Sequence, residues 1–190
     1  RDAQESRGLG DVYKRQNEST EDNTYLSYNK VIGTSLDEKL YLAFQILDYA
    51  LLSAPGAPIT KALLEAGIGK DISGSYDSST YQPIFSIVAK NANEEQKAEF
   101  VKVIEDTLKT IVENGMDKKA LEAGINYHEF RYREADFGGY PKGLMYGLQI
   151  FDSWLYDENK PFVHVEAGET FEIIKKNSEN GFFAKFIEDN

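Results

Sequence analysis

Residues 51–74 read LLSAPGAPITKALLEAGIGKDISG, and this stretch decides how the rest of the chain is organised. Pro55 and Pro58 cannot lie inside a helix, because proline lacks the backbone N–H and clashes with the preceding turn. A helix that arrives from the N-terminal side must therefore end near Ser53.

A short helix should follow this break. Pro58 suits the first turn of a helix, where a missing N–H costs nothing. The apolar positions of that helix, which we expect to be buried, are Ile59, Leu63 and Leu64. Gly67 and Gly69 supply the left-handed backbone that ends a helix, and residues 71–77 then read as a strand.

The segment before residue 51 predicts a strand and a longer helix. Residues 24–33 are rich in aromatic and β-branched side chains and end at a glycine, which is typical of a strand. Ser35 and Glu38 have the spacing of a capping box, so we expect Ser35 to cap a helix that runs to Ser53. The core face of this helix would consist of Leu40, Phe44, Leu47 and Leu51.

After residue 74 the pattern predicts a hairpin and then a series of helices. Residues 77–80 have turn chemistry, so residues 71–77 and 82–90 should pair, with Pro83 at the start or edge of the second strand. Asn93 should cap the first helix. The helices are expected over residues 93–115, 117–135, 142–156, 169–177 and 182–188. The first should bury Val101, Ile104, Leu108 and Ile111, and the third Leu144, Leu148, Phe151 and Leu155. The predicted fold class is α+β, an antiparallel sheet with helices packed on one face.

Composition excludes several classes of protein. The chain has 21 basic and 32 acidic residues, a net charge of −11, which disfavours nucleic acid and anionic membranes as partners. It contains no cysteine, so disulfides, thiolate nucleophiles and thiolate metal sites are excluded. No apolar run approaches the length of about 18 residues that a membrane span requires. We expect a soluble, cytoplasmic protein.

The first residues do not read as part of a fold. Residues 6–16 (SRGLGDVYKRQ) are what a tagmentation sequencing adaptor encodes in one reading frame, so residues 1–16 are set aside as an artefact. Residues 17–23 are polar and predict a disordered linker. If an adaptor precedes the native part, the chain is a fragment of a longer protein.

The deciding stretch resembles the insulinase-like (pitrilysin, M16) zinc metallopeptidases. Its PITKAL and GIGKDISG runs are most similar to the presequence-protease branch. Residues 137–160 (FGGYPKGLMYGLQIFDSWLYDENK) resemble the place where that branch leaves its second domain and enters the helical linker between the two halves of the enzyme. The resemblance implies a non-catalytic M16-like domain over residues 24–160 and the start of the linker over residues 161–190.

No residue of the chain is predicted to be catalytic, to bind a cofactor or to ligate a metal. A catalytic zinc site needs three protein ligands, whereas the chain has only His128 and His164, separated by a predicted helix break. The run His128-Glu129-Phe130-Arg131-Tyr132 is neither H-E-x-x-H nor H-x-x-E-H. The glycine pair at 138 and 139 lacks the lysine and hydroxyl of a phosphate loop. The carboxylate pairs Glu94/Glu95 and Glu134/Asp136 read as solvated faces.

The positions of arginine and tyrosine side chains test which half of the enzyme this chain resembles, because the family uses an arginine and tyrosine pair in its second half to bind substrate. Arg131, Arg133 and Tyr140 lie after the long helices, whereas the family places its pair in the segment equivalent to residues 61–69. There Lys61 stands at the arginine position and Ile68 or Gly69 at the tyrosine position. Because the chain lacks the arginine and tyrosine pair of the second half, the resemblance implies a domain of the first half of the enzyme.

The resemblance implies a fragment of a zinc metalloendopeptidase that degrades short unfolded peptides. The segment would act as a scaffold and chamber wall, and zinc would be held by the intact parent enzyme, not by this fragment. Its partners would be the catalytic domain, the second half of the same polypeptide and peptide substrates. Two alternatives remain open: a domain of a catalytically inactive M16-like structural subunit, and an unrelated α+β binding module. An H-x-x-E-H motif upstream would distinguish the active peptidase from the inactive structural subunit.

Overall fold

A computed structural model describes residues 21–178 and 181–190, and the predictions for residues 1–16 and 17–20 lie outside these ranges. The described elements, in chain order, are β1 (Thr24–Val31), α2 (Glu38–Asp48), the π-helix η1 (Tyr49–Ser53), α3 (Pro58–Glu65), β2 (Asp71–Asp77), β3 (Ile84–Ala92), the 3-10 turn η2 (Glu94–Gln96), α4 (Lys97–Asn114), α5 (Lys118–Glu134), α6 (Lys142–Trp154), α7 (Gly168–Asn177) and α8 (Phe182–Asp189). The fold class is α+β, as predicted.

The three described strands form an antiparallel sheet in the order β1-β3-β2. The predicted hairpin is confirmed, since β2 pairs with β3 from Asp71 opposite Lys90 to Asp77 opposite Ile84. The first strand pairs with the other edge of β3. Alternation of side chains then gives the sheet two unlike faces.

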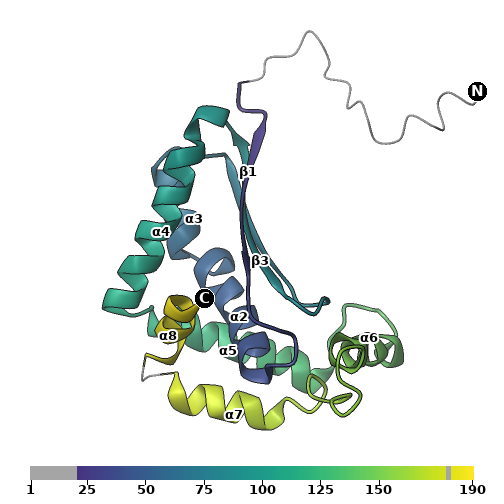
Figure 1. The fold of residues 1–190 in the computed structure, drawn as a ribbon. Helices are drawn as coiled ribbons and strands as arrows, with labels where there is room; N and C mark the ends of the chain where they lie inside the picture. The colour runs from purple at the N-terminus through teal and green to yellow at the C-terminus, as the bar shows by residue number, and fades with distance from the viewer. Residues whose placement is uncertain (1–20, 179–180) are drawn as a thin grey trace, which may run out of the picture.

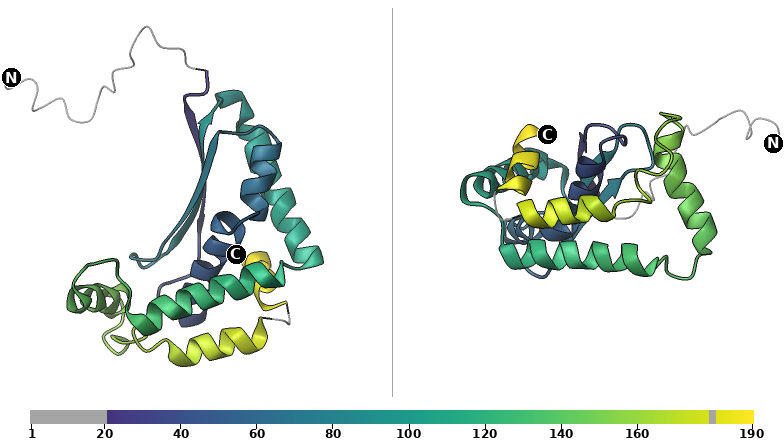
Figure 2. Two further views of the ribbon diagram at one scale, coloured as in Figure 1. Left: turned by 180° about the vertical axis from the view of Figure 1, so that it is seen from behind. Right: turned by 90° about the horizontal axis from the view of Figure 1, so that it is seen from below.

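One face of the sheet is covered by helices α2, α3 and α4, and the other is not (Figures 1 and 2). On β3, the side chains that point to the helices, Phe85, Ile87 and Ala89, are buried. Fully buried partners from the helices include Leu47, Ile59, Leu63 and Ile104. Apolar burial on this side is the main stabilising contribution, at about 25 cal/mol per Å².

The deciding stretch folds largely as predicted. The longer helix does end at Ser53, and its last turn is a π-turn in which the Ala54 N–H donates to the Tyr49 carbonyl at 2.8 Å. Pro58 begins α3, whose N-terminus is tied back because Thr60 Oγ1 donates to the Leu52 carbonyl at 2.8 Å. Gly67 and Gly69 have φ values of 69° and 71°, so the left-handed helix stop is confirmed.

Two details of this region were predicted wrongly. Ser35 does not cap α2: the cap is Asp37, whose Oδ1 accepts from the Leu40 N–H at 2.9 Å. Ser35 lies just before this turn, where its side chain is buried and its hydroxyl has no hydrogen-bond partner among the described residues. Leu64 is 47% exposed, so the buried face of α3 is narrower than expected.

The predicted helices after the hairpin are present, and the packing of α4 is close to the prediction. Asn93 forms a capping box with Gln96, and Gly115 ends α4 with a φ of 82°. On α4, Ile104 and Ile111 are buried as expected, while Val101 and Leu108 are only partly buried. Phe100, which the periodicity left out, is buried as well.

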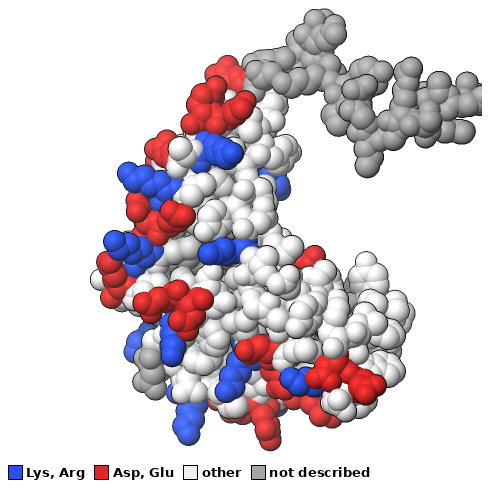
Figure 3. All heavy atoms as spheres, in the orientation of Figure 1, with Lys and Arg blue, Asp and Glu red and all other residues white. Residues whose placement is uncertain are grey.

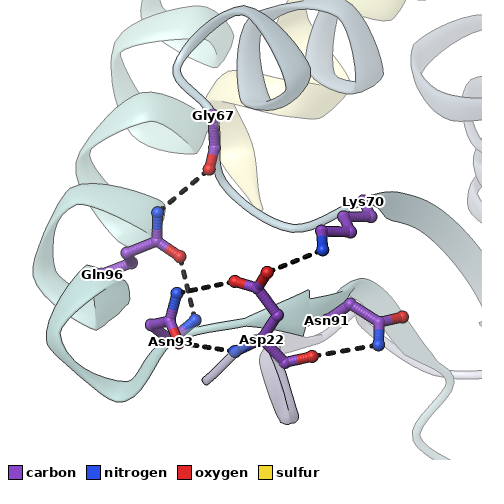
Figure 4. Close-up of polar contacts among 6 residues, drawn as sticks. All are labelled: Asp22, Gly67, Lys70, Asn91, Asn93 and Gln96. Carbon is purple, nitrogen blue, oxygen red and sulfur yellow. Dashed lines mark hydrogen bonds and ion pairs between the residues drawn. The ribbon is translucent and has the colours of Figure 1, made fainter.

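A polar cluster fixes the start of β1 to the open end of the β2–β3 hairpin, away from the turn (Figure 4). The Asp22 N–H donates to Asn93 Oδ1 at 2.8 Å, and Asp22 Oδ2 lies 2.6 Å from Lys70 Nζ. Gln96 Nε2 donates to the Gly67 carbonyl at 3.0 Å. Hydrogen bonding and charge from Lys70 hold the pKa of Asp22 below its ordinary value. Each of these groups has a structural partner within the cluster. We therefore assign the cluster a structural role: it holds the start of β1 to the loops before β2 and after β3.

Candidate interaction surface

The two histidines of the chain line one cavity. His128 on α5 and His164 in the connection between α6 and α7 both border a space of about 200 Å³, together with Arg131, Asp136 and Gln149. The two histidines were expected to be separated by a helix break, and the fold brings them to one cavity despite it.

Both histidines are held in the neutral form. Burial lowers the pKa of His164 to about 4, against a weaker opposing hydrogen bond to the Ser35 backbone. Burial and the nearby Arg131 lower the pKa of His128 to about 4 as well. Residues 21–178 and 181–190 contain no group of three histidine, cysteine or acidic side chains that could hold a metal ion. The described part of the chain therefore does not fit a catalytic zinc.

A partly buried polar cluster joins α2 to α6. His164 stacks on Tyr41 with ring centroids 3.7 Å apart, and the Tyr41 hydroxyl donates to Asp152 Oδ2 at 3.3 Å. Burial raises the pKa of Tyr41 to about 12 and that of Asp152 to about 6. Tyr41 and Asp152 are 111 residues apart, so nothing in the sequence signalled this pair.

Glu129 has a structural role. It is 8% exposed on α5, and its carboxylate accepts from Arg133 at 2.7 Å and lies 2.5 Å from Lys175 Nζ on α7. Burial acts to raise the pKa of Glu129, but Lys175 and Arg133 outweigh it, so the pKa is lowered. The ion pairs attach α7 to α5.

The remaining charged and aromatic candidates do not converge. The Arg131 guanidinium lies 5.7 Å from the centroid of the Tyr127 ring, and Arg133 is tied to Glu129. Tyr140 is 66% exposed. On α3, Lys61 is 3.8 Å from Glu65 at the surface, while Ile68 is buried in the core. The carboxylate pairs Glu94/Glu95 and Glu134/Asp136 are exposed, as expected.

The middle of the uncovered sheet face carries small polar side chains, with Val31, Ile84 and Val88 on the same face. Asn29 Nδ2 donates to Ser27 Oγ at 2.9 Å, and Ser86 Oγ donates to Asn29 Oδ1 at 2.7 Å across the strands. Ser75 lies opposite Ser86 on the third strand. This face borders a hollow whose visible wall is mostly uncharged, between the sheet and the lobe that contains α6 (Figure 3).

Helix α6 has its apolar side outward, which is the main error of the sequence analysis. Leu144, Leu148, Phe151 and Leu155 were expected in the core, but they are 54%, 50%, 46% and 68% exposed. These four residues are called the α6 stripe below. The inner side of the helix is mixed: Met145, Tyr146 and Ile150 are partly buried there, and the Ser153 hydroxyl is fully buried and donates to the Lys160 carbonyl at 2.6 Å.

The end of α6 also touches the hairpin. The Tyr156 ring lies 5.1 Å from that of Tyr81, in the turn between β2 and β3, and Phe151 stacks on Trp154 at 5.9 Å. Both tyrosines and Trp154 are 40% exposed or more. The helix, the hairpin tip and the uncovered sheet face therefore form one side of the molecule. No helix in the described ranges is long and apolar enough to cross a bilayer.

Comparisons with known proteins agree on one family. Residues 3–127 match the family model described as the peptidase M16 inactive domain. The chain is 46% identical over 173 residues to Protein HypA of Clostridium perfringens, covering 91% of this chain and 18% of that protein. It is 37% identical over 153 residues to Presequence protease 1, chloroplastic/mitochondrial, of Arabidopsis thaliana, covering 80% of this chain and 14% of that protein. The chain thus spans less than a fifth of the length of these relatives.

Solved structures show the same fold. The crystal structure of the inactive peptidase domain of a Bordetella parapertussis protein described as a zinc protease superposes with a TM-score of 0.65 at 7% identity, covering 86% of this chain and 82% of that one. A related structure from Bordetella pertussis gives a TM-score of 0.64 at 11% identity, with 86% and 84% covered. At these identities the likeness concerns the fold alone.

Proposed function

The chain belongs to the peptidase M16 inactive domain family, and from this membership we propose that it is a non-catalytic domain of a presequence-protease-like zinc metalloendopeptidase that degrades short unfolded peptides. The support is the identity to a presequence protease over 80% of this chain, combined with the small share of that protein's length that the chain spans. Zinc would be held by a part of the parent polypeptide outside this chain, since the described residues do not fit it.

Within this enzyme the domain would serve as a scaffold and as part of a chamber wall. The observation that carries this assignment is the one-sided sheet, whose helix-free face borders a hollow. That face offers hydroxyl and amide groups from Ser27, Asn29, Ser75 and Ser86, alongside the apolar side chains of Val31, Ile84 and Val88. Such groups tolerate water and extended peptide backbones equally well, which suits the wall of a chamber for unfolded peptides. The partners would be the catalytic domain and second half of the same polypeptide.

The test uses the intact parent polypeptide and this chain side by side. We expect the intact polypeptide to cleave short unstructured peptides, to lose this activity with a chelator and to regain it with zinc. The 190-residue chain should have no peptidase activity and bind no stoichiometric zinc. Chelator-sensitive cleavage by the chain alone would overturn the assignment of sites. An intact polypeptide without activity and without H-x-x-E-H would favour the inactive structural subunit.

The wall assignment has its own test. In the intact polypeptide, Ser75→Trp places a large side chain on the uncovered sheet face and should raise KM for peptides by several-fold, with zinc content unchanged. The matched control is Thr110→Trp, at an exposed position of α4 on the other side of the sheet, which should leave KM unchanged. Equal KM values for the two variants would contradict the wall assignment.

We also propose a cytoplasmic location for the parent polypeptide. A net charge of −11 is common among cytosolic proteins, although named relatives include organellar enzymes. Fractionation of source cells with an antibody against this domain tests the location, and recovery with membranes or secreted protein would contradict it.

A further inference from the structure

The α6 stripe requires an explanation, because the helix leaves four large apolar side chains outside its own domain. Its inner side makes polar contacts through Asp152 and Ser153, and it lines a cavity with Met145, Tyr146 and Gln149. Its outer side exposes Leu144, Leu148, Phe151 and Leu155 to between 46% and 68%. A surface helix of a complete globular unit turns its main apolar stripe toward the core.

The exposed apolar surface extends beyond the stripe. Trp154 and Leu155 lie side by side in sequence at 48% and 68% exposure, and Phe151 stacks on Trp154. The Tyr81 and Tyr156 rings continue it to the hairpin tip. Monomeric proteins rarely leave large apolar patches in water, and patches of this kind mark interaction sites.

We propose that the α6 stripe is the docking surface for an apolar segment of the same parent polypeptide that lies outside residues 1–190. This inference rests on the proposed function for its premise that the chain is one domain of a longer enzyme. The two relatives described above contain this region as only 18% and 14% of their length, so most of the polypeptide is available as the occupant. Because the occupant is on the same chain, its effective concentration at the stripe is high.

The charges favour an apolar segment of the same polypeptide over a charged segment or a second copy of the chain. From Leu144 to Leu155 the one charged side chain is Asp152, which is partly buried and accepts from Tyr41, so the outer surface complements an apolar segment better than a basic or acidic one. A second copy is disfavoured, because the net charge of −11 on each chain makes two copies repel one another.

Thiol accessibility in the intact polypeptide tests the proposal. Residues 1–190 contain no cysteine, so a label found on the peptide that includes position 148 reports only the introduced thiol. In Leu148→Cys, we expect maleimide labelling under native conditions to be at least about tenfold slower than after denaturation in urea. Leu155→Cys should behave alike and gives a second, independent variant. The control is Glu95→Cys, at an exposed position in the first turn before α4, whose thiol should label at similar rates in both states.

Each other outcome overturns the proposal. Fast native labelling of the Leu148→Cys thiol would mean that nothing covers the stripe. Protection that disappears on dilution would identify a second copy as the occupant, and protection that appears only with added peptide would identify substrate. Peptidase activity of the same samples separates this question from the proposed function: a protected thiol in an inactive polypeptide would leave the docking surface standing while the enzyme assignment fell.

Discussion

Helix α2 with its continuation η1, and helix α6, carry the same apolar pattern in opposite environments. In the first, Leu40, Phe44, Leu47 and Leu51 recur at intervals of four, three and four residues, and all are 7% exposed or less. In α6 the stripe has the same intervals, and all four residues are 46% exposed or more. Periodicity therefore identifies the apolar side of a helix but does not say whether its cover lies within the same domain.

The largest difference should appear when one leucine of each set is shortened. Leu47→Ala removes fully buried methyl groups and should lower the free energy of unfolding by about 2–5 kcal/mol. Leu148→Ala in the isolated chain should change it by no more than about 0.5 kcal/mol, because the side chain is half exposed. Urea unfolding of both variants measures the difference, and equal losses would show that the α6 stripe is part of the core of this domain.

Much of the fold followed from local signals, and the errors have physical causes. The break at Pro55 and Pro58 and the helix stop at Gly67 and Gly69 depend on the backbone geometry of the residues themselves, so they can be predicted from sequence. The cap of α2 was assigned to Ser35 because its spacing to Glu38 fits a capping box, yet α2 begins at Glu38, so Asp37 holds the cap position and its side chain, an equally good cap, accepts from the Leu40 N–H. Leu64 and the α6 stripe were placed in the core because a pattern of apolar residues contains no information about distant partners.

The candidate site was less predictable than the fold. Zinc-ligand motifs are contiguous and can be judged from sequence, whereas the contact of Tyr41 with Asp152 depends on tertiary packing across 111 residues. The cavity that His128 and His164 share also depends on tertiary packing. The uncovered sheet face could be predicted only in part, since alternation gives two faces but not which one the helices cover.

Glycine substitutions sharpen the comparison on the backbone. A Cβ at Gly74 would overlap Leu52 Cδ1 and lie 2.8 Å from Asp48 Oδ1, so Gly74→Ala should lower stability by about 1–3 kcal/mol. A Cβ at Gly147 in α6 would meet nothing within 4 Å, so Gly147→Ala should raise stability by about 0.5–1 kcal/mol through helix propensity. Thermal or urea unfolding gives both signs, and a loss at Gly147 would indicate that α6 packs more closely than described.

Partly buried carboxylates of the two helices should differ in the pH dependence of their contribution to stability. Burial alone raises the pKa of Asp48 at the end of α2 from 3.8 to about 6. The folded state then binds more protons than the unfolded state between these values, so this carboxyl lowers stability as pH rises from about 4 to 6. Asp48→Asn should therefore stabilise the chain by about 1–2 kcal/mol near pH 7.5 and by little near pH 4.

Asp152 on α6 is the matched case. Its pKa is also raised to about 6 by burial, but its carboxylate accepts the Tyr41 hydroxyl. Asp152→Asn should gain less than Asp48→Asn at neutral pH, because the charged acceptor is lost together with the desolvation cost. Urea titrations at the two pH values measure both variants, and a pH-independent gain for Asp48→Asn would contradict the cause given for its pKa.

The smallest expected effect lies at the contact between the hairpin tip and the end of α6. A double-mutant cycle with Tyr81→Ala and Tyr156→Ala should give a coupling free energy of about 0.5–1 kcal/mol, typical of one aromatic pair near the surface. Zero coupling would mean that α6 and the hairpin are not held together by these rings.

The central claim is that the apolar pattern of α2 and η1 serves this domain while that of α6 serves another part of the parent polypeptide. Amide hydrogen exchange, read by mass spectrometry in the 190-residue chain and in the intact polypeptide, tests it most directly. We predict slow exchange of α2 and η1 in both, and exchange of α6 that is fast in the chain and at least about tenfold slower in the intact polypeptide. Equally fast exchange of α6 in both would contradict the claim.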